Sequence, residues 1–362
     1  MRLENGSILR RHSGWLTVVA FTICGVCTAQ SLRQEADGAD LLIGAAVRPS
    51  LLSERLYAST LGREFSMVEA EDAMKWLALR PDKTTYDFRE GDEVVRFAQA
   101  HQMKVRGHCL VWDHDHPDWL TQGHFTSRQL SRLLHEHINH VMRHYAGRVF
   151  AWDVVNEGLD EKGRLRNSIW YNQPGIGFSE NGTAYLAQVF RWAHKADPQA
   201  LLFYNDAEGE GLNHKSDAIY AMVRDFKQRN VPIDGVGLQM HVPMLDADIP
   251  AIAANIARLT ALGLQVHITE LDVSLPVNSS GMPEPEDLAR QAVVYRGIVR
   301  ACLNSRGCTA IQTWGFTDKY SWIGSHSRGS RGQALPFDRR YQPKSAYRAM
   351  FEELAAGRST AH

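Results

Sequence analysis

The sequence predicts a single (β/α)₈ barrel, also called a TIM barrel. Short apolar runs alternate with longer amphipathic stretches eight times, which is typical of a parallel sheet wrapped in helices. The chain has 362 residues, 44% of them hydrophobic, so it can bury one large core. Polar side chains follow the apolar runs, where a barrel places its active site.

The N-terminal 29 residues are expected to be a signal peptide. Three arginines precede an apolar run over residues 15–27, and the small residues Thr28 and Ala29 follow it. The run is shorter than the roughly 20 residues that a membrane helix needs, so cleavage near Ala29 is favoured over a retained anchor. A lipoprotein is disfavoured because Ile23 and Val26 precede the two cysteines. We therefore expect a secreted or periplasmic protein whose catalytic barrel is residues 30–362.

Composition limits the class of partner. The formal net charge is −1, and no basic stretch is interleaved with aromatic residues, which argues against nucleic acid and anionic membranes. No second apolar stretch has membrane length, so no stable membrane insertion is expected after cleavage. Nine tryptophans suit a neutral sugar ligand, because flat aromatic faces match the C–H faces of sugar rings.

Three cysteines remain after cleavage. An exported protein meets an oxidising compartment, so we expect a disulfide between Cys302 and Cys308. Cys109 lies in an apolar strand and is expected to be a buried, inert thiol.

The eight apolar runs predict the strands of the barrel. They are Leu41–Val47, Phe65–Ala70, Lys104–Leu110, Val149–Val155, Leu201–Asn205, Gly235–Leu238, Gln265–Leu271 and Thr309–Thr313. The helices expected between and after them include Ser127–Ala146, Ala184–Ala196, Lys215–Arg229, Pro250–Leu262, Glu286–Leu303 and Lys344–Ala356. No linker rich in proline and serine indicates an appended module.

Chemically capable residues stand at or just after the ends of these strands. From the second strand to the eighth they are Glu71 and Lys75, His108 and Trp112, Asn156 and Glu157, Asn205 and Asp206, Gln239 and His241, Glu270 and Asp272, and Trp314 and Trp322. Because the active site of a barrel is built from this rim, we expect them to converge on one cleft.

Two of these residues fit glycoside hydrolysis. Glu157 ends a buried apolar strand, where a carboxyl group is poorly solvated and can remain a proton donor near neutral pH. Glu270 and Asp272 are two residues apart and share one face of an extended chain. A pair of carboxylates, one acid/base and one nucleophile, is the minimum that the reaction requires. The alternative is that both glutamates are ordinary rim residues paired with neighbouring cations.

Eight segments in register resemble glycoside hydrolase family 10, which is best known for endo-1,4-β-xylanases. The resemblance covers essentially the whole mature chain. The segments are EAEDAMKW (69–76), RGHCLVW (106–112), WDVVNE (152–157), ND (205–206), DGVGLQMH (234–241), ITELDV (268–273), WGFTDKYSW (314–322), and LPFD with YQPKSAY (335–338 and 341–347). The resemblance implies an endo-acting retaining xylanase on a barrel fold, with xylan as its partner and with neither a cofactor nor a metal.

The resemblance also implies roles for single residues. Glu157 would be the acid/base, Glu270 the nucleophile, and Asn156 the ligand of the 2-hydroxyl of the reacting sugar. His241 would lie between Glu270 and Asp272 and keep the nucleophile ionised. The implied substrate-binding residues are Glu71, Asp72, Lys75, His108, Trp112, Asn205, Gln239, Trp314 and Trp322. Core packing is the alternative for the three tryptophans.

Five positions depart from the pattern of the family in or near the expected cleft. The family usually carries Asn at Asp72, His at Asp113, Gln at Asp115, Ser at Met240 and an aromatic residue at Ala207. The catalytic pair is unchanged, so the reaction type stands while the sugar preference is open.

Three other functions compete with this interpretation. A metalloenzyme is suggested by the segment 113–116 and by His140 and His144, which can share a helix face, but Asn139 stands where an HExxH motif needs its second histidine. A non-catalytic sugar-binding barrel would lack one of the two glutamates. The same mechanism acting on another β-glycan or on aryl glycosides stays open, because a pocket discriminates one hydroxymethyl group by only a few kcal/mol.

Overall fold

Eight parallel strands close into a barrel, as the sequence predicts. The computed structural model describes residue 1, residues 30–243 and residues 247–358. The barrel strands are β1 (Leu42–Val47), β2 (Met67–Ala70), β3 (Lys104–Val111), β4 (Ala151–Asn156), β5 (Leu201–Asp206), β6 (Gly235–Leu238), β8 (Gln265–Val273) and β10 (Cys308–Thr313). Closure comes from β10, which pairs with both β8 and β1. Strand β8 runs two residues beyond its expected end and so includes Asp272.

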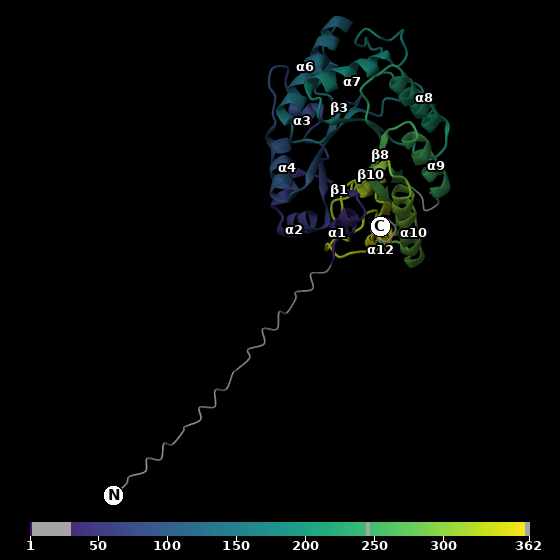
Figure 1. Ribbon diagram of the computed structural model, residues 1–362. Helices are drawn as coiled ribbons and strands as arrows, with labels where there is room; N and C mark the ends of the chain where they lie inside the picture. Colours follow the sequence, from purple (N-terminus) through teal and green to yellow (C-terminus); the bar gives the residue numbers. More distant parts are fainter. Residues whose placement is uncertain (2–29, 244–246, 359–362) are drawn as a thin grey trace. The chain divides into compact units, whose positions relative to one another are not determined.

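Helices form a ring around the strands (Figure 1). The longer helices are α1 (Leu32–Gly38), α2 (Arg55–Glu64), α4 (Arg89–Ala100), α6 (Ser127–Tyr145), α7 (Ala184–Ala196), α8 (His214–Gln228), α9 (Ile249–Thr260), α10 (Pro285–Leu303) and α12 (Ser345–Arg358). Of these, α1, α2 and α4 are not among the helices named from the sequence pattern. The short elements are η1 (Pro49–Ser53), α3 (Trp76–Leu79), α5 (Asp118–Thr121), α11 (Ile323–His326), β7 (His241–Val242), β9 (Leu275–Pro276) and β11 (Arg331–Gly332).

Local sequence signals fix where several helices begin. The side chain of Thr126 accepts the N–H of Gln129 at the start of α6, and Asn213 accepts the N–H of Ser216 at the start of α8. Both are capping boxes, which satisfy backbone donors that the first turn leaves free. Proline occupies the first turn of α9 and α10, where its missing N–H costs nothing.

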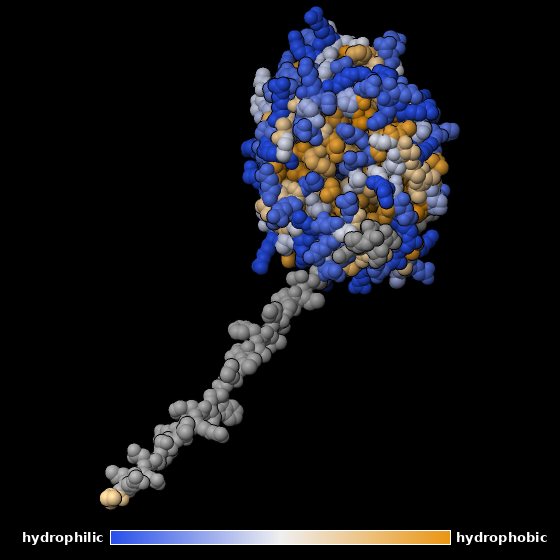
Figure 2. Space-filling view, viewed as in Figure 1, coloured by the Kyte–Doolittle hydropathy of each residue, from blue (hydrophilic) through white to orange (hydrophobic). Residues whose placement is uncertain are grey.

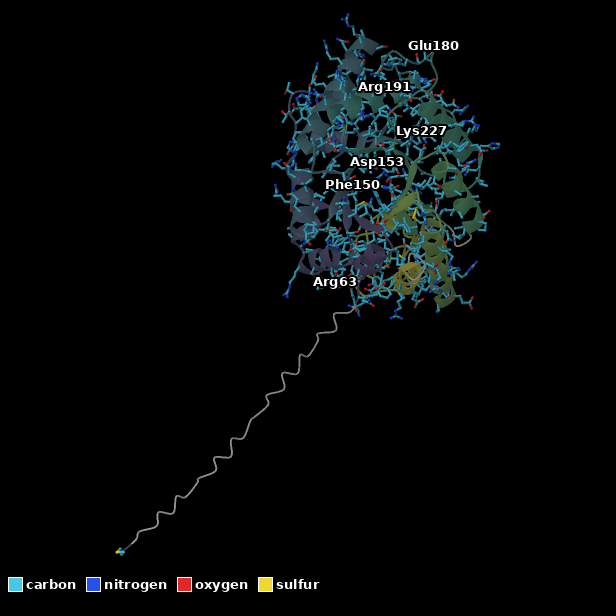
Figure 3. The ribbon with its side chains drawn as sticks, viewed as in Figure 1. Arg63, Phe150, Asp153, Glu180, Arg191 and Lys227 are labelled. Carbon is cyan, nitrogen blue, oxygen red and sulfur yellow. A yellow bond between two sulfur atoms is a disulfide. The ribbon has the colours of Figure 1, made fainter. Side chains whose placement is uncertain are left out.

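The core lies between strands and helices, with a polar layer inside the barrel. Large aromatic side chains such as Trp152, Phe203 and Tyr295 are fully buried. Asp153, labelled inside the ring of helices in Figure 3, is buried as well. On the face seen in Figure 2, hydrophilic residues cover the rim and hydrophobic residues gather toward the middle.

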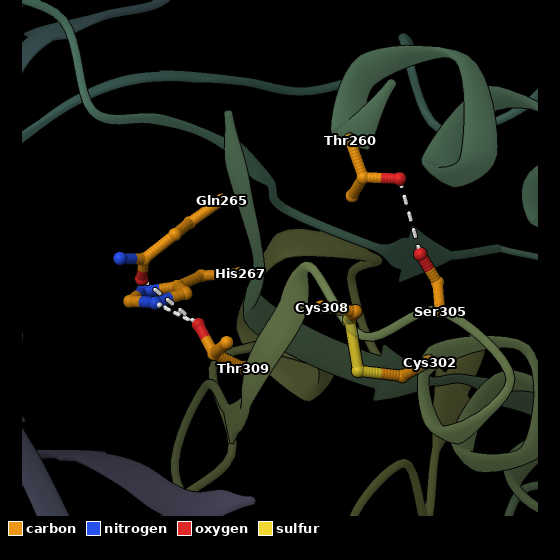
Figure 4. Close-up of a disulfide and its surroundings, with 7 residues drawn as sticks. All are labelled: Thr260, Gln265, His267, Cys302, Ser305, Cys308 and Thr309. Carbon is orange, nitrogen blue, oxygen red and sulfur yellow. Dashed lines mark hydrogen bonds between the residues drawn. A yellow bond between two sulfur atoms is a disulfide. The ribbon is translucent and has the colours of Figure 1, made fainter. Parts of the chain in front are cut away.

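A disulfide joins Cys302, near the end of α10, to Cys308 at the start of β10 (Figure 4). This is the pair expected from the sequence. Cys109 is a buried free thiol.

Two expectations concern the N-terminal signal peptide and membrane-spanning helices. The predicted signal peptide lies outside the described residues except for Met1. Among the residues that the structure describes, no helix combines the length and the apolar character that a membrane crossing requires.

Candidate active site

The residues expected on the rim converge on one cleft of about 860 Å³. The expected residues that line it are Glu71, Asp72, Lys75, His108, Trp112, Asn156, Glu157, Gln239, His241, Glu270, Asp272, Trp314 and Trp322. They come from segments up to 251 positions apart, from Glu71 to Trp322. They meet because each follows or ends a parallel strand, and parallel strands present their carboxyl ends on one side of the barrel. Asn205 and Asp206, also expected there, are fully buried and do not belong to this lining.

Glu270 is a buried carboxylate held by hydrogen-bond donors on both oxygens. Asn205 Nδ2 donates to Oε1 over 2.7 Å, and His241 Nε2 lies 3.2 Å from Oε2. Burial alone raises the pKa of Glu270, but the hydrogen bond from His241 and the charges of His108 and His241 outweigh it and lower that pKa. The side chain is thus prepared as an ionised, oriented carboxylate, which is the state that a nucleophile needs.

His241 connects Glu270 to Asp272. Its Nδ1 lies 2.9 Å from Asp272 Oδ2, and Trp322 Nε1 donates to the same oxygen over 2.9 Å. With a carboxylate at each ring nitrogen, both nitrogens act as donors and the imidazole carries a positive charge. Burial lowers the pKa of His241, but Asp272 and Glu270 outweigh it and raise that pKa well above its usual value.

A run of amide side chains joins Glu157 to Glu270. Gln239 Nε2 donates to Glu157 Oε1 and to Asn156 Oδ1, each over 3.1 Å. Asn205 Nδ2 then donates to Asn156 Oδ1 over 2.8 Å and to Glu270 Oε1. Because each amide is fixed at both ends, the two carboxylates are held in a set relation to each other.

The backbone aims Glu157 into the cleft. Strand β4 ends at Asn156, and Glu157 has φ 53°, a left-handed conformation that few non-glycine residues adopt. Its N–H donates to the carbonyl oxygen of Asn205 over 2.9 Å, which holds this turn against β5. The acidic side chain therefore leaves the strand abruptly at the rim.

Asp72 and Lys75 form a second group of charges in the cleft. Lys75 Nζ donates to Asp72 Oδ1 over 2.8 Å and faces the rings of Trp112 and Trp314, at 4.8 Å and 5.7 Å from their centroids. Burial lowers the pKa of Lys75, but Asp72 outweighs it and raises that pKa. These tryptophans line the cleft, which excludes the alternative that they only pack in the core.

Several cleft residues escape the sequence analysis. Arg48 Nε donates to Glu71 Oε2 over 2.7 Å. Arg48 directly follows β1, so it fits the strand-end rule, by which residues at or just after the ends of barrel strands form the active site. The remaining residues of the lining come from loops and from the short elements β7, α11 and β11, whose course the sequence does not reveal. They are Glu208, Glu210, Asn213, Val242, Pro243, Ser274, Ile323, His326, Ser327 and Arg331.

Only two of the five departures from the family pattern line the cleft. Asp72 and Ala207 do, whereas Asp113, Asp115 and Met240 do not. Met240 is buried and its N–H donates to Glu210 Oε1 over 3.1 Å.

The histidines considered as metal ligands pack against aromatic rings. His140 stacks on Tyr86 and His144 stacks on Phe88. Within the described part of the chain, the one group of ligand-type side chains close enough for a metal is Glu69, His108 and Asp153, within 4.8 Å. Arg106 forms ion pairs with both of these carboxylates and already supplies positive charge, so we assign no metal there.

The chain matches one family model and many known proteins. The model is Glycosyl hydrolase family 10, over residues 31–353. Endo-1,4-beta-xylanase B of Thermotoga neapolitana is 38% identical over 303 residues, which covers 84% of each chain. The endo-1,4-beta-xylanase of Agaricus bisporus is 34% identical over 313 residues, covering 85% of this chain and 90% of that one.

Solved structures agree with the described fold. Native xylanase 10B from Thermotoga maritima superposes with a TM-score of 0.86 at 38% identity, covering 91% of this chain and 99% of that one. Xylanase 10B from Thermotoga petrophila RKU-1, solved in complex with xylobiose, has a TM-score of 0.86 at 37% identity and covers 91% and 98%.

Proposed function

This chain belongs to glycosyl hydrolase family 10, and from this premise we propose that it hydrolyses internal β-1,4-xylosidic bonds of xylan with retention of configuration. One observation carries the proposal. Glu157 and Glu270 line one cleft and are joined through Gln239, Asn156 and Asn205, so two carboxylates face the same substrate in fixed positions.

In the first step Glu157 donates its proton to the glycosidic oxygen while Glu270 attacks the anomeric carbon. The bond from that carbon to the leaving oxygen breaks, and a bond to a Glu270 oxygen forms. In the second step Glu157, now ionised, takes a proton from water, whose oxygen displaces Glu270. Two inversions give net retention.

His241 has a positioning role in this scheme. Its contact with Oε2, together with the contact of Asn205 with Oε1, orients the carboxylate of Glu270, and its positive charge favours the ionised nucleophile. When the glycosyl-enzyme forms, Glu270 loses its charge, and Asp272 still holds the imidazole in place.

We also propose that residues 1–29 direct export and are removed near Ala29. The disulfide between Cys302 and Cys308 supports this, because such bonds persist in oxidising compartments. N-terminal sequencing of protein recovered from the medium or periplasm tests it, and an intact Met1 in active exported protein would contradict it.

Release of reducing ends from xylan, carboxymethylcellulose and barley β-glucan, measured side by side, tests the activity. We expect rapid release from xylan, with the β-anomer appearing first by NMR, and none from xylan with Glu270→Ala. Faster release from barley glucan would show that the enzyme uses the same mechanism on a glucan chain instead of xylan. An initial α-anomer would overturn retention, and inactivity on all three would support a sugar-binding barrel.

A further inference from the structure

A layer of charged side chains lies inside the barrel beneath the cleft. Glu69 on β2, Arg106 on β3 and Asp153 on β4 are fully buried, and none of them lines the cleft. The proposed reaction uses none of the three. Because burying a net charge is costly, the positive and negative charges of this layer must balance, and this balance restricts the protonation states of its members.

Arg106 pairs chiefly with Asp153. Its Nη2 donates to Asp153 Oδ1, and its Nε donates to Oδ2 over 3.2 Å, which makes a bidentate pair. Burial raises the pKa of Asp153, but Arg106 and His108 outweigh it and lower that pKa. Asp153 is therefore ionised and neutralises Arg106.

Glu69 is left without its own counter-charge. Arg106 Nε is 3.2 Å from Glu69 Oε2, but neither oxygen of Glu69 accepts a hydrogen bond from the described residues. The next closest cationic atom is His108 Nδ1, 4.0 Å from Oε1. Two carboxylates facing one guanidinium leave the layer one proton short of neutrality.

His267, the other histidine in this layer, cannot supply that proton. Arg106 only donates, so His267 Nδ1, 2.7 Å from Arg106 Nη1, must accept. Its Nε2–H then donates to Thr309 Oγ1 over 3.0 Å, and Thr309 donates to Gln265 (Figure 4). Burial and the charge of Arg106 hold the pKa of His267 well below its usual value, so the ring is neutral.

His108 is placed to take the proton. Its Nδ1 lies 3.0 Å from Asp153 Oδ2, so this nitrogen donates to an ionised carboxylate. The ring also lines the cleft, 5.4 Å from the ring of Trp314, which leaves the second nitrogen as the one that can meet a substrate. Protonation of that second nitrogen would turn it from an acceptor into a donor.

The charged groups around His108 favour its protonation. Asp153 on β4 and Glu270 on β8 are negative, and Glu69 on β2 is negative whenever it has given up its proton. The nearby cation Lys75 faces the rings of Trp112 and Trp314. Burial lowers the pKa of His108, but the hydrogen bond with Asp153 and the charges of Glu69 and Glu270 outweigh it and raise that pKa. Burial favours the neutral acid at Glu69 and raises the pKa of that group to about 8, so Glu69 and His108 compete for protons.

We propose that Glu69 and His108 hold one titratable proton between them, and that this pair decides whether the cleft-facing edge of His108 is a hydrogen-bond donor. Glu69 is then a positioning residue that acts through His108. An ionised Glu270 draws the positive charge to His108, which shares the cleft with it, and conversion of Glu270 to an ester weakens that preference. The effect of this pair on catalysis rests on the proposed function, whereas the sharing of the proton between Glu69 and His108 does not.

The test is Glu69→Gln in the mature protein, with His108 titrated by ¹⁵N NMR and its signals assigned by their loss in His108→Asn. Without the second carboxylate, Asp153 and Arg106 balance each other. We expect the midpoint of the His108 titration to fall by about one pH unit or more, a tenfold change in its charged fraction. The matched control is Glu64→Gln, which removes a buried carboxylate that binds Leu32 N–H and the hydroxyl of Tyr347. An unchanged His108 midpoint in Glu69→Gln would overturn the proposal.

Activity and infrared spectra give independent readings. In Glu69→Gln the acidic limb of kcat/KM on an aryl xylobioside should move to higher pH, because Glu270 loses the charge of His108.

If Glu69→Gln does not fold, the variant His108→Asn tests the pair by removing the histidine instead of the carboxylate. The proton must then stay on Glu69, and the carbonyl stretch of an un-ionised carboxyl group should appear near neutral pH. Its absence would overturn the proposal. A protein without xylanase activity that shows the expected NMR shift would refute the proposed function and leave the pair standing.

Discussion

His241 Nε2 lies 3.2 Å from Oε2 of Glu270, and the same imidazole contacts Asp272 through its other nitrogen. His241 and Glu270 shift each other's pKa. The two carboxylates keep His241 charged, and the charged His241 lowers the pKa of Glu270 against the effect of burial. The nucleophile is therefore ionised at acidic pH, where a buried carboxyl group alone would be protonated.

The first prediction concerns the acidic limb of activity. Glu270 attacks only when ionised, so kcat/KM falls as pH drops through its pKa. His241→Asn removes the charge that lowers this pKa, and we expect the acidic limb to move up by about one pH unit or more. The measurement is kcat/KM on an aryl xylobioside from pH 3 to 8. His326→Asn is the control, because His326 packs against Trp322 and, among the described residues, forms no hydrogen bond with Glu270, so the acidic limb of this variant should not move. An unmoved limb in His241→Asn would show that Glu270 is held ionised by other groups.

The strand-end rule explains why so much of the site was predictable. A parallel barrel brings the C-terminal ends of its strands to one rim, so the positions of Glu157, Glu270 and Trp314 follow from the order of strands alone. Arg48 obeys the same rule at the end of the first strand, although the residues expected from the sequence begin at the second.

Other features depend on register across the barrel and could not be predicted. Glu69 and Asp153 lie in strands that read as buried, and only the paired strands show that both face Arg106. The left-handed backbone of Glu157 likewise has no local signal such as glycine. Loops and short elements supply the rest of the cleft, including Glu208 in a loop and Arg331 in β11, and their course depends on tertiary contacts.

The second prediction is that Glu270→Ala abolishes hydrolysis of xylan and of activated aryl glycosides. No covalent intermediate can form without the carboxylate. Azide should restore part of the activity on an aryl glycoside and give a glycosyl azide of inverted configuration, which NMR identifies. Substantial activity without azide would refute the assignment of Glu270 as the nucleophile.

The third prediction separates two substrates with Glu157→Ala. Xylan has a poor leaving group that needs a proton, so its hydrolysis should fall by about 10²–10⁴-fold. A dinitrophenyl glycoside leaves without protonation and should still form the glycosyl-enzyme quickly, seen as a burst of dinitrophenol. Equal losses on both substrates would mean that Glu157 does not act as the acid.

The fourth prediction concerns stability in acid. His137 is fully buried, stacks 3.7 Å from Trp76, and has no hydrogen-bond partner among the described residues at either ring nitrogen. Burial and nearby Arg80 hold the pKa of His137 well below its usual value of 6.5. Below pH 6.5 the unfolded chain binds a proton that the folded chain does not, so stability falls with pH by ~1.4 kcal/mol per unit for this group.

His137→Phe should remove that loss and keep the ring stacked on Trp76. We expect the acid midpoint of unfolding, followed by circular dichroism, to move to lower pH. His135→Phe is the control, because His135 is exposed on the same helix, and it should leave the midpoint in place. A midpoint in His137→Phe equal to or above that of the unmodified protein would refute the role of His137.

The fifth prediction concerns Asp72, where the family usually carries Asn. Its side chain is 70% exposed and pairs with Lys75, whose side chain is only 8% exposed. Asp72 does not cap α3, because no side chain caps the start of that helix. An ionised Asp can only accept hydrogen bonds and occupies a Lys75 donor, whereas an Asn both donates and accepts. Asp72→Asn should therefore free Lys75 for the sugar.

One or two added sugar hydrogen bonds are worth on the order of 1–3 kcal/mol, so kcat/KM on xylotetraose should rise about tenfold in Asp72→Asn. We expect a single-residue aryl xyloside to be too short to reach Asp72, so its kcat/KM should stay nearly unchanged. Asp113→Asn is the matched control, since Asp113 also departs from the family pattern but does not line the cleft. A fall on xylotetraose would show that the carboxylate itself binds sugar, and equal effects on both substrates would place Asp72 outside substrate recognition.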